Sequence, residues 1–170
     1  MTTQSKSALT SLRRLAGGAL VAAATTLASG GLQAATAAEI EVVIDRVKAL
    51  DVIDLSGGAD FYAQVTIAGE VFKTEPMKDQ NEISPNWVIR KRVHHGTYDV
   101  KLEILDKDVS KDDPIDINRV DPKRDLDFRV NTRTCGITGF AQYYHCGTII
   151  QRAGNEKKKA EITFRVYVRR

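Results

Sequence analysis

Apolar and polar residues alternate one by one along several segments of this 170-residue chain. An alternation with a period of two places one row of side chains in a core and the other in solvent, which predicts β-strands. The pattern is clearest near the end of the chain, in residues 160–168. In residues 40–49 the apolar row continues only after a shift near Asp45, which indicates a β-bulge. In the segment 97–104 the apolar row is Tyr98, Val100, Leu102 and Ile104, and the polar row is Asp99, Lys101 and Glu103.

Further extended segments separated by turn residues predict the fold class. From position 39 onward, no part of the chain has the periodicity of an amphipathic helix. About eight strands with turn signals between them predict an all-β protein, an eight-stranded antiparallel β-sandwich forming one domain. Residues 74–85 are expected to be a polar loop. The remaining predicted strands are 61–68, 71–73, 87–93, 115–120 and 126–130, with strand-like residues at 147–151.

The segment 1–38 has the composition of a cleavable signal peptide. Lys6, Arg13 and Arg14 precede an Ala/Gly-rich apolar stretch at 15–32, and a small-residue cleavage site follows at 35–37. Gly, Ser and Thr interrupt the apolar stretch, which makes it unlike a permanent transmembrane helix. We therefore expect a signal peptide at 1–38 and a mature domain at 39–170 that is secreted or periplasmic, with no transmembrane segment after cleavage.

The signal peptide also accounts for the net charge. The whole chain has 25 basic and 22 acidic residues, and the segment 1–38 holds three of the basic ones and none of the acidic ones. The mature domain is therefore balanced, and its charge gives no reason to expect nucleic acid as a partner.

The two cysteines, Cys135 and Cys146, lie close together in a chain expected to be exported. In an oxidising compartment such a pair is expected to form a disulfide closing a short loop.

An unusual density of carboxylates follows the strand at 97–104. Residues 106–113 contain four aspartates and two lysines, and Asp54 and Asp60 lie in a glycine-containing loop before another predicted strand. Carboxylates so close together repel one another unless a cation neutralises them. Hard oxygen ligands on loops are what Ca²⁺ prefers. The four aspartates of the later cluster are Asp106, Asp108, Asp112 and Asp113.

Four segments together resemble the C2 domain, a family of β-sandwiches that bind calcium and phospholipid. These segments are DLSGGADFYAQV at 54–65, AGEVFKT at 68–74, SPNW at 84–87 and ILDKDVSKDD at 104–113. The resemblance covers residues 40–131. Phe61 stands where the family has a proline, and the segment with the cysteines is not typical of the family.

The resemblance implies two facing loops at one end of the sandwich that hold Ca²⁺. Its ligands would be Asp54, Asp60, Asp106, Asp108 and the last aspartate of the acidic loop. That loop is one residue shorter than in the family, so either Asp112 or Asp113 could be this last ligand. A bound ion would then contact an anionic partner, either a phospholipid or a cell-surface component; a protein partner is a further expectation.

Two other features bear on function. Arg90 and Arg92 share one face of the strand 87–93 and are candidates for binding an anion or lipid headgroup, although solvated edge charges have the same pattern. The chain has none of the common hydrolase or metalloprotease motifs, so we do not expect an enzyme. The sequence thus predicts a secreted calcium-binding module, and the alternative is a calcium-independent structural or protein-interaction domain.

Overall fold

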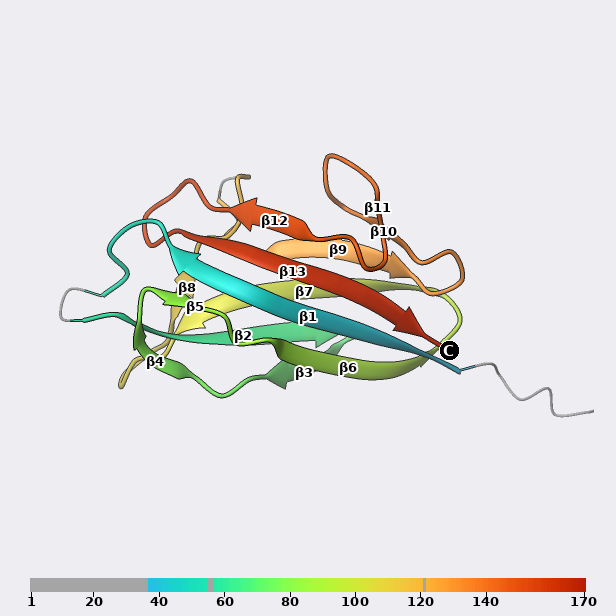
Figure 1. Cartoon of the computed structure of the whole chain (residues 1–170), viewed down its shortest axis with the longest axis horizontal. Helices are drawn as coiled ribbons and strands as arrows, with labels where there is room; N and C mark the ends of the chain where they lie inside the picture. The colour runs from blue at the N-terminus through green and yellow to red at the C-terminus, as the bar shows by residue number, and fades with distance from the viewer. Residues whose placement is uncertain (1–36, 55–56, 121) are drawn as a thin grey trace, which may run out of the picture. The chain divides into compact units, whose positions relative to one another are not determined.

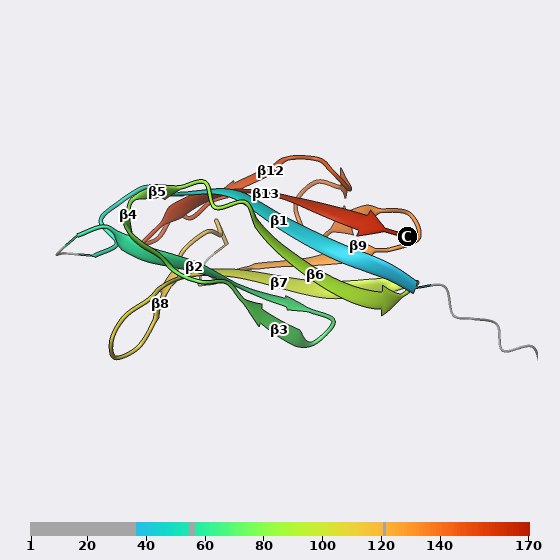
Figure 2. The ribbon, with the colours of Figure 1, turned by 60° about the horizontal axis from the view of Figure 1, so that its bottom comes forward.

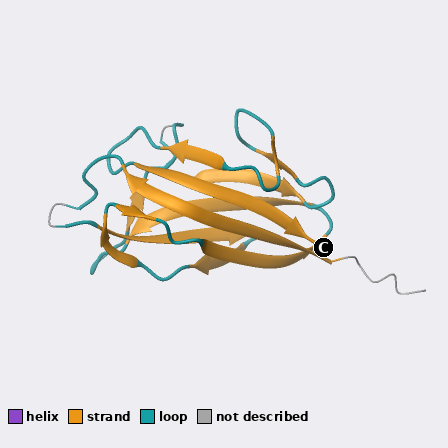
Figure 3. Cartoon of the chain, viewed as in Figure 1, coloured by secondary structure: helices purple, strands orange, loops and turns teal. Residues whose placement is uncertain are grey.

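In a computed structural model of the chain, residues 37–54, 57–120 and 122–170 are described. Nearly all of the predicted signal peptide lies outside the described residues; its last two positions, Ala37 and Ala38, begin the first strand. The described part of the chain consists of strands and loops, with no helix (Figure 3). No helix in these residues is therefore long and apolar enough to cross a membrane.

Thirteen strands in the described residues form two antiparallel sheets (Figure 1). The first sheet has the order β12-β13-β1-β5, and β6 also pairs with β1. Its strands are β1 (Ala37–Ala49), β5 (Glu82–Ile83), β6 (Trp87–His94), β12 (Ile150–Ala153) and β13 (Ala160–Arg169).

The second sheet has the order β11-β10-β9-β7-β2-β3, with β4 on β2 and β8 on β7. The predicted all-β antiparallel sandwich is therefore confirmed, with more short strands than the eight expected. The strands of this sheet are β2 (Ala59–Ile67), β3 (Glu70–Lys73), β4 (Met77–Gln80), β7 (Thr97–Asp106), β8 (Asp113–Ile115), β9 (Leu126–Asn131), β10 (Gly136–Thr138) and β11 (Tyr144–His145).

The core lies between the two sheets and is built from the apolar rows of the alternating segments. In β13, Ile162, Phe164 and Val166 are buried, and the ring of Phe164 contacts that of Phe128 from the second sheet at 5.7 Å between centroids. The predicted bulge in β1 is present, because the register with β13 shifts between Ile44 and Arg46. The shift returns the apolar row of β1 to the core.

Three segments differ from the sequence prediction. Of the strand-like residues 147–151, only Ile150 and Gln151 lie in a strand, β12. The expected strand at 115–120 is wrong: the strand is β8, at Asp113–Ile115, and no strand covers 116–120. Asp116 leaves the alternation because its carboxylate accepts backbone N–H groups inside the protein, and the Asn118 side chain accepts the Val120 N–H in a local turn. The polar loop expected at 74–85 contains the short strands β4 and β5, which pair with the edges of longer strands.

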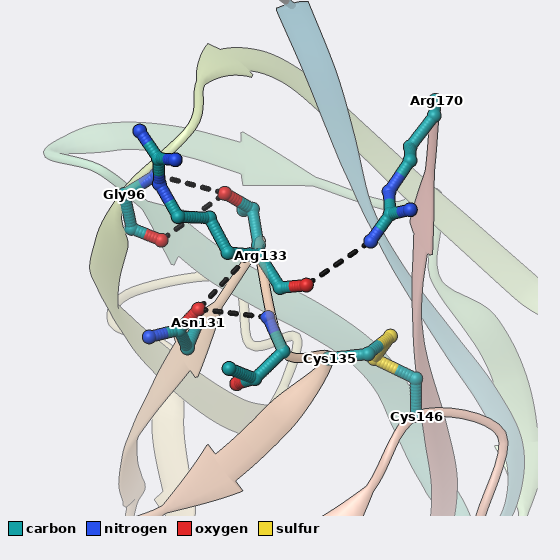
Figure 4. Close-up of a disulfide and its surroundings, with 8 residues drawn as sticks. Gly96, Asn131, Arg133, Cys135, Cys146 and Arg170 are labelled. Carbon is teal, nitrogen blue, oxygen red and sulfur yellow. Dashed lines mark hydrogen bonds between the residues drawn. A yellow bond between two sulfur atoms is a disulfide. The ribbon is translucent and has the colours of Figure 1, made fainter.

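The disulfide between Cys135 and Cys146 is present and closes the β10–β11 hairpin (Figure 4). The backbone N–H of Cys146 donates to the carbonyl of Cys135 at 2.9 Å. Nearby, the Asn131 side chain accepts the N–H of Arg133, and the Arg170 guanidinium donates to the Arg133 carbonyl at 3.0 Å. The last residue of the chain is thereby joined to the turn before the hairpin.

Replacing Phe164 by alanine tests the position of the core. We expect Phe164→Ala to lower the free energy of unfolding by about 3–5 kcal/mol, because a fully buried ring leaves a cavity. Urea denaturation measures the loss. Thr163→Ala, on the other face of β13, is the control and should change the free energy of unfolding by less than about 1 kcal/mol. Equal losses in the two variants would contradict the assigned orientation of β13.

Candidate metal centre

The two acidic segments predicted from the sequence lie at the same end of the sandwich. β2 and β7 are antiparallel with Phe61 opposite Asp106, so β2 begins where β7 ends. β8 pairs with β7 in turn and places Asp113 opposite Asp106. We call this the acidic end: the end where β2 begins and β7 ends, together with the β7–β8 and β12–β13 turns beside it (Figure 2).

Asp106 is the carboxylate on which the acidic end is centred. It is only 3% exposed, and its Oδ1 accepts the backbone N–H of Asp60 at 2.7 Å. The Lys107 N–H donates to the carbonyl of Asp60 at 3.0 Å, which completes the link between the two acidic segments. The last residue of β7 thus contacts the beginning of β2 directly.

Burial and like charges make the ionised form of Asp106 unfavourable. Burial raises the pKa of Asp106, and the carboxylates of Asp108 and Asp54 raise it further; the Asp60 N–H and Lys158 oppose the rise. A carboxyl whose pKa is raised on folding lowers the stability of the folded chain at neutral pH, and this loss disappears as the pH falls. The fold therefore holds a negative charge where a cation would be stabilising.

Asp112 and Asp113, the two alternatives for the last ligand, have different surroundings. Asp112 accepts the Tyr62 hydroxyl at 2.7 Å and the Lys107 ammonium at 3.0 and 3.1 Å on its two oxygens. These bonds lower the pKa of Asp112, and burial together with Asp112 raises the pKa of Tyr62 to about 12. Both oxygens of Asp112 are thus engaged within the protein, whereas Asp113 pairs with Lys158.

Asp60 is held by a residue that the sequence did not single out. The Asp60 Oδ1 accepts the backbone N–H of Asp79 at 2.8 Å, and the Asp79 side chain accepts the N–H of Gly58 at 2.7 Å. A Cβ on Gly58 would lie 2.5 Å from the Asp79 carbonyl carbon, so only glycine permits this approach. The β4 region therefore braces the loop that carries Asp60.

Lys158 is the second residue that sequence reasoning missed. It lies on the β12–β13 turn, 45 residues after Asp113 in the chain, and its ammonium contacts the Asp113 carboxylate. Asp113 raises the pKa of Lys158, with further contributions from Asp108 and Asp106. No local pattern around 157–159, a run of three lysines, distinguishes the middle residue as the one that reaches the acidic end.

The donor chemistry of the acidic end suits calcium, since every candidate ligand is a hard carboxylate oxygen. As these side chains are placed, no three or more His, Cys, Asp or Glu groups of the described ranges are arranged to hold a metal ion. The Lys158 ammonium contacts Asp113, and the charges of Asp108 and Asp106 also act on it. The ligand types of the acidic end thus fit calcium, and a lysine already pairs with one of the candidate ligands.

Arg90 and Arg92 lie toward the other end of β1, away from the acidic end. They are opposite Glu41 and Glu39 in the β1–β6 register. The Glu41 carboxylate, 2% exposed, accepts from Arg90 at 2.6 Å and from Arg169 at 2.7 Å. Arg92 is 88% exposed and lies 4.0 Å from Glu39. Arg90 is therefore committed to a buried carboxylate, and of the two arginines Arg92 presents its charge to solvent.

Comparison with solved structures identifies the fold. The chain is similar to the human GIVD cytosolic phospholipase A2 (17% identity, TM-score 0.53, covering 79% of this chain and 16% of that one). It is similar to the calcium-bound pair of C2 domains of extended-synaptotagmin 2 (14%, 0.53, covering 76% and 45%) and to a single C2 domain of plant extended synaptotagmin 1 (11%, 0.54, covering 77% and 93%). The sequence matches no protein-family model and no curated protein.

These likenesses are of fold alone, because the identities are only 17%, 14% and 11%. The described residues have a C2-like fold, as the resemblance of the four sequence segments implied. The chain spans a small part of the phospholipase and nearly all of the single plant C2 domain. The likeness therefore concerns one β-sandwich.

The ion pairs of Glu41 give a test of pH dependence. The Arg169 hydrogen bond, with Arg90, holds the pKa of Glu41 below its usual value of about 4.3. A depressed carboxyl pKa contributes stability that is complete above the ordinary pKa and is lost as the pH falls through the folded one. We expect Glu41→Gln to lower the free energy of unfolding at pH 7 by about 1–3 kcal/mol, with the deficit shrinking as the pH falls below ~4.

Urea denaturation between pH 3 and 7 measures this difference. Glu39→Gln is the matched control, because Glu39 lies 3.7 Å from Arg90 and is more exposed. The prediction is contradicted if Glu41→Gln loses the same free energy of unfolding at every pH, or if Glu39→Gln loses as much. Either result would show that the charge of Glu41 does not stabilise the fold.

Proposed function

We propose that this chain is an exported, non-enzymatic module whose acidic end binds calcium and, through it, an anionic partner. The observation that carries the proposal is the buried Asp106 carboxylate, whose ionised form is opposed by burial and by two neighbouring carboxylates. A fold that keeps such a charge loses stability unless a cation compensates it. The C2-like fold and the calcium-bound state of one similar structure support the choice of ion.

The proposed ligands are Asp54, Asp60, Asp106, Asp108 and Asp113. They come from two segments that the β2–β7 pairing brings together, which is the arrangement that a chelating site needs. Asp112 is left out because Tyr62 and Lys107 occupy its oxygens. Its role is instead to fix the turn that presents Asp108 and Asp113, since its Oδ1 also accepts the Asp108 N–H.

Bound calcium would neutralise these carboxylates and offer its remaining coordination positions to an oxygen of a phospholipid headgroup or a surface polymer. The residues around the site are suited to a shallow contact: the exposed large apolar side chains next to the acidic segments include Val109, Val52 and Leu50, at 110%, 69% and 43% exposure. Two valines and a partly exposed leucine give little apolar area for insertion into a bilayer. The expected contact is therefore at the headgroup level.

Export is proposed from the composition of residues 1–38, and the disulfide agrees with an oxidising compartment. A non-catalytic role is proposed because the sequence has none of the common hydrolase or metalloprotease motifs.

A second candidate function is a calcium-independent structural or protein-interaction domain. The observation in its favour is that two lysines already pair with carboxylates of the acidic end, Lys107 with Asp112 and Lys158 with Asp113. In this case the lysines take the place of the ion.

Removing two carboxylates separates these candidates. In wild type we expect 10 mM Ca²⁺ to stabilise the protein by about 1.4–2.7 kcal/mol, from a dissociation constant on the order of 10⁻⁴–10⁻³ M. Asp106→Asn with Asp108→Asn should abolish the calcium-induced rise in melting temperature, and should melt higher than wild type in EDTA because the repulsion is gone. Differential scanning calorimetry with and without calcium measures both effects.

The matched control is Asp99→Asn with Asp127→Asn, which removes the same charge from the same sheet away from the acidic end. Its calcium response should equal that of wild type. A double Asp106/Asp108 variant that responds to calcium as wild type does would rule out the proposed site, and no response in wild type would favour the second candidate.

Sedimentation with vesicles tests the partner. We expect the wild-type domain to sediment with phosphatidylserine vesicles in 1 mM Ca²⁺ and to stay in the supernatant in EDTA or with phosphatidylcholine vesicles. Sedimentation that is independent of calcium would place lipid binding elsewhere on the domain.

A further inference from the structure

The acidic end contains a positive side chain that neither the sequence pattern nor the ligand set explains. Lys158 pairs with Asp113, and its charge acts on Asp106 and Asp108 as well. These are three of the five carboxylates proposed as ligands. An ammonium group and a calcium ion would therefore be attracted to the same place by the same charges.

The backbone around Lys158 is built to hold it there. Asp116, fully buried, accepts the N–H groups of Asn155 at 2.9 Å and Glu156 at 2.7 Å on one carboxylate oxygen. The Asp116 N–H donates to the carbonyl of Lys158 at 2.8 Å. A Cβ on Gly154 would lie 2.2 Å from the Asp116 carbonyl oxygen, so the turn needs glycine at this point.

The same turn is tied to the residues that directly follow β1. The Lys159 N–H donates to the Asp51 carboxylate at 2.9 Å, and the Lys159 carbonyl accepts the Leu50 N–H at 2.9 Å. Lys158, directly before Lys159, has a φ of +55°, in the left-handed region that non-glycine residues seldom adopt. Such a conformation persists only where the surroundings impose it, and here they direct the residue to the acidic end.

We infer that Lys158 is a built-in counter-ion of the acidic end, which competes with calcium for the carboxylates and sets how tightly calcium binds. This inference rests on the proposed calcium site and adds its regulation. Without calcium, Lys158 offsets part of the repulsion among Asp106, Asp108 and Asp113. When calcium binds, the Lys158 side chain turns away into solvent, while its backbone stays anchored through Asp116.

The exposure of the pair agrees with this exchange. The side chains of Lys158 and Asp113 are 36% and 40% exposed, so the ammonium can regain water without disturbing the core. Lys107 is unlike Lys158, because its partner Asp112 is also held by the Tyr62 hydroxyl and is not a proposed ligand. The competition therefore concerns a single lysine.

The test is Lys158→Met in the mature domain, which removes the charge, keeps most of the unbranched side chain and adds no hard ligand. Isothermal titration with CaCl₂ should give a dissociation constant about tenfold lower than that of wild type, because a like charge next to the ion is gone. In EDTA the variant should melt below wild type, because the carboxylates lose their counter-ion. This second readout requires no calcium.

Two variants serve as controls. Lys157→Met removes the same charge from the neighbouring residue, which is exposed and makes no side-chain ion pair among the described residues; it should bind calcium as wild type does. Lys158→Arg keeps the charge and should retain the melting temperature of wild type in EDTA.

The possible outcomes distinguish a failure of this inference from a failure of the proposed calcium site. Tighter binding by Lys158→Met, or binding by Lys158→Met where wild type binds none, supports the inference. Equal dissociation constants for wild type and Lys158→Met overturn it and leave the calcium site intact. If neither wild type nor Lys158→Met binds calcium up to 10 mM, the inference and the proposed calcium site are both overturned, since Lys158 is then not what prevents calcium binding.

Discussion

The antiparallel pairing of β2 with β7 is the constraint on which the acidic end depends. Its register places Asp106 opposite Phe61, and the bond from the Asp60 N–H to Asp106 closes the ladder at this end. Because both strands have their alternate residues buried, a shift of either strand by one position would turn its apolar row to solvent. The core therefore fixes the distance between two acidic segments that are 46 residues apart.

The electrostatics of this end follow from that register. A carboxylate at the last position of a buried strand is desolvated whether or not an ion is present, and Asp106 is such a carboxylate. The chain responds with three kinds of compensation: backbone N–H groups to Asp60 and Asp106, the Lys107 and Tyr62 side chains to Asp112, and Lys158 to Asp113. The last of these comes from the β12–β13 turn, which belongs to the other sheet.

The sequence predicted the fold well where burial alone decides the structure. The alternation in β7 and β13, the bulge in β1 and the disulfide were all read correctly, because each depends on local spacing or on a pair of cysteines. The prediction was wrong at 115–120, where Asp116 turns inward to accept backbone N–H groups from a turn almost forty residues later. No pattern in the neighbouring residues indicates such a partner.

By itself, the sequence determined that residues 39–170 form an all-β sandwich and that carboxylates gather in two of their segments. A period of two and a local density of aspartates are properties of adjacent residues. Only the tertiary structure decided which of Asp112 and Asp113 is engaged within the protein, that Asp79 and Asp116 support the loops, and that Lys158 reaches the acidic end. The physical reason is that these contacts join residues from separate turns, and their distances are set by how the two sheets pack and not by any spacing along the chain.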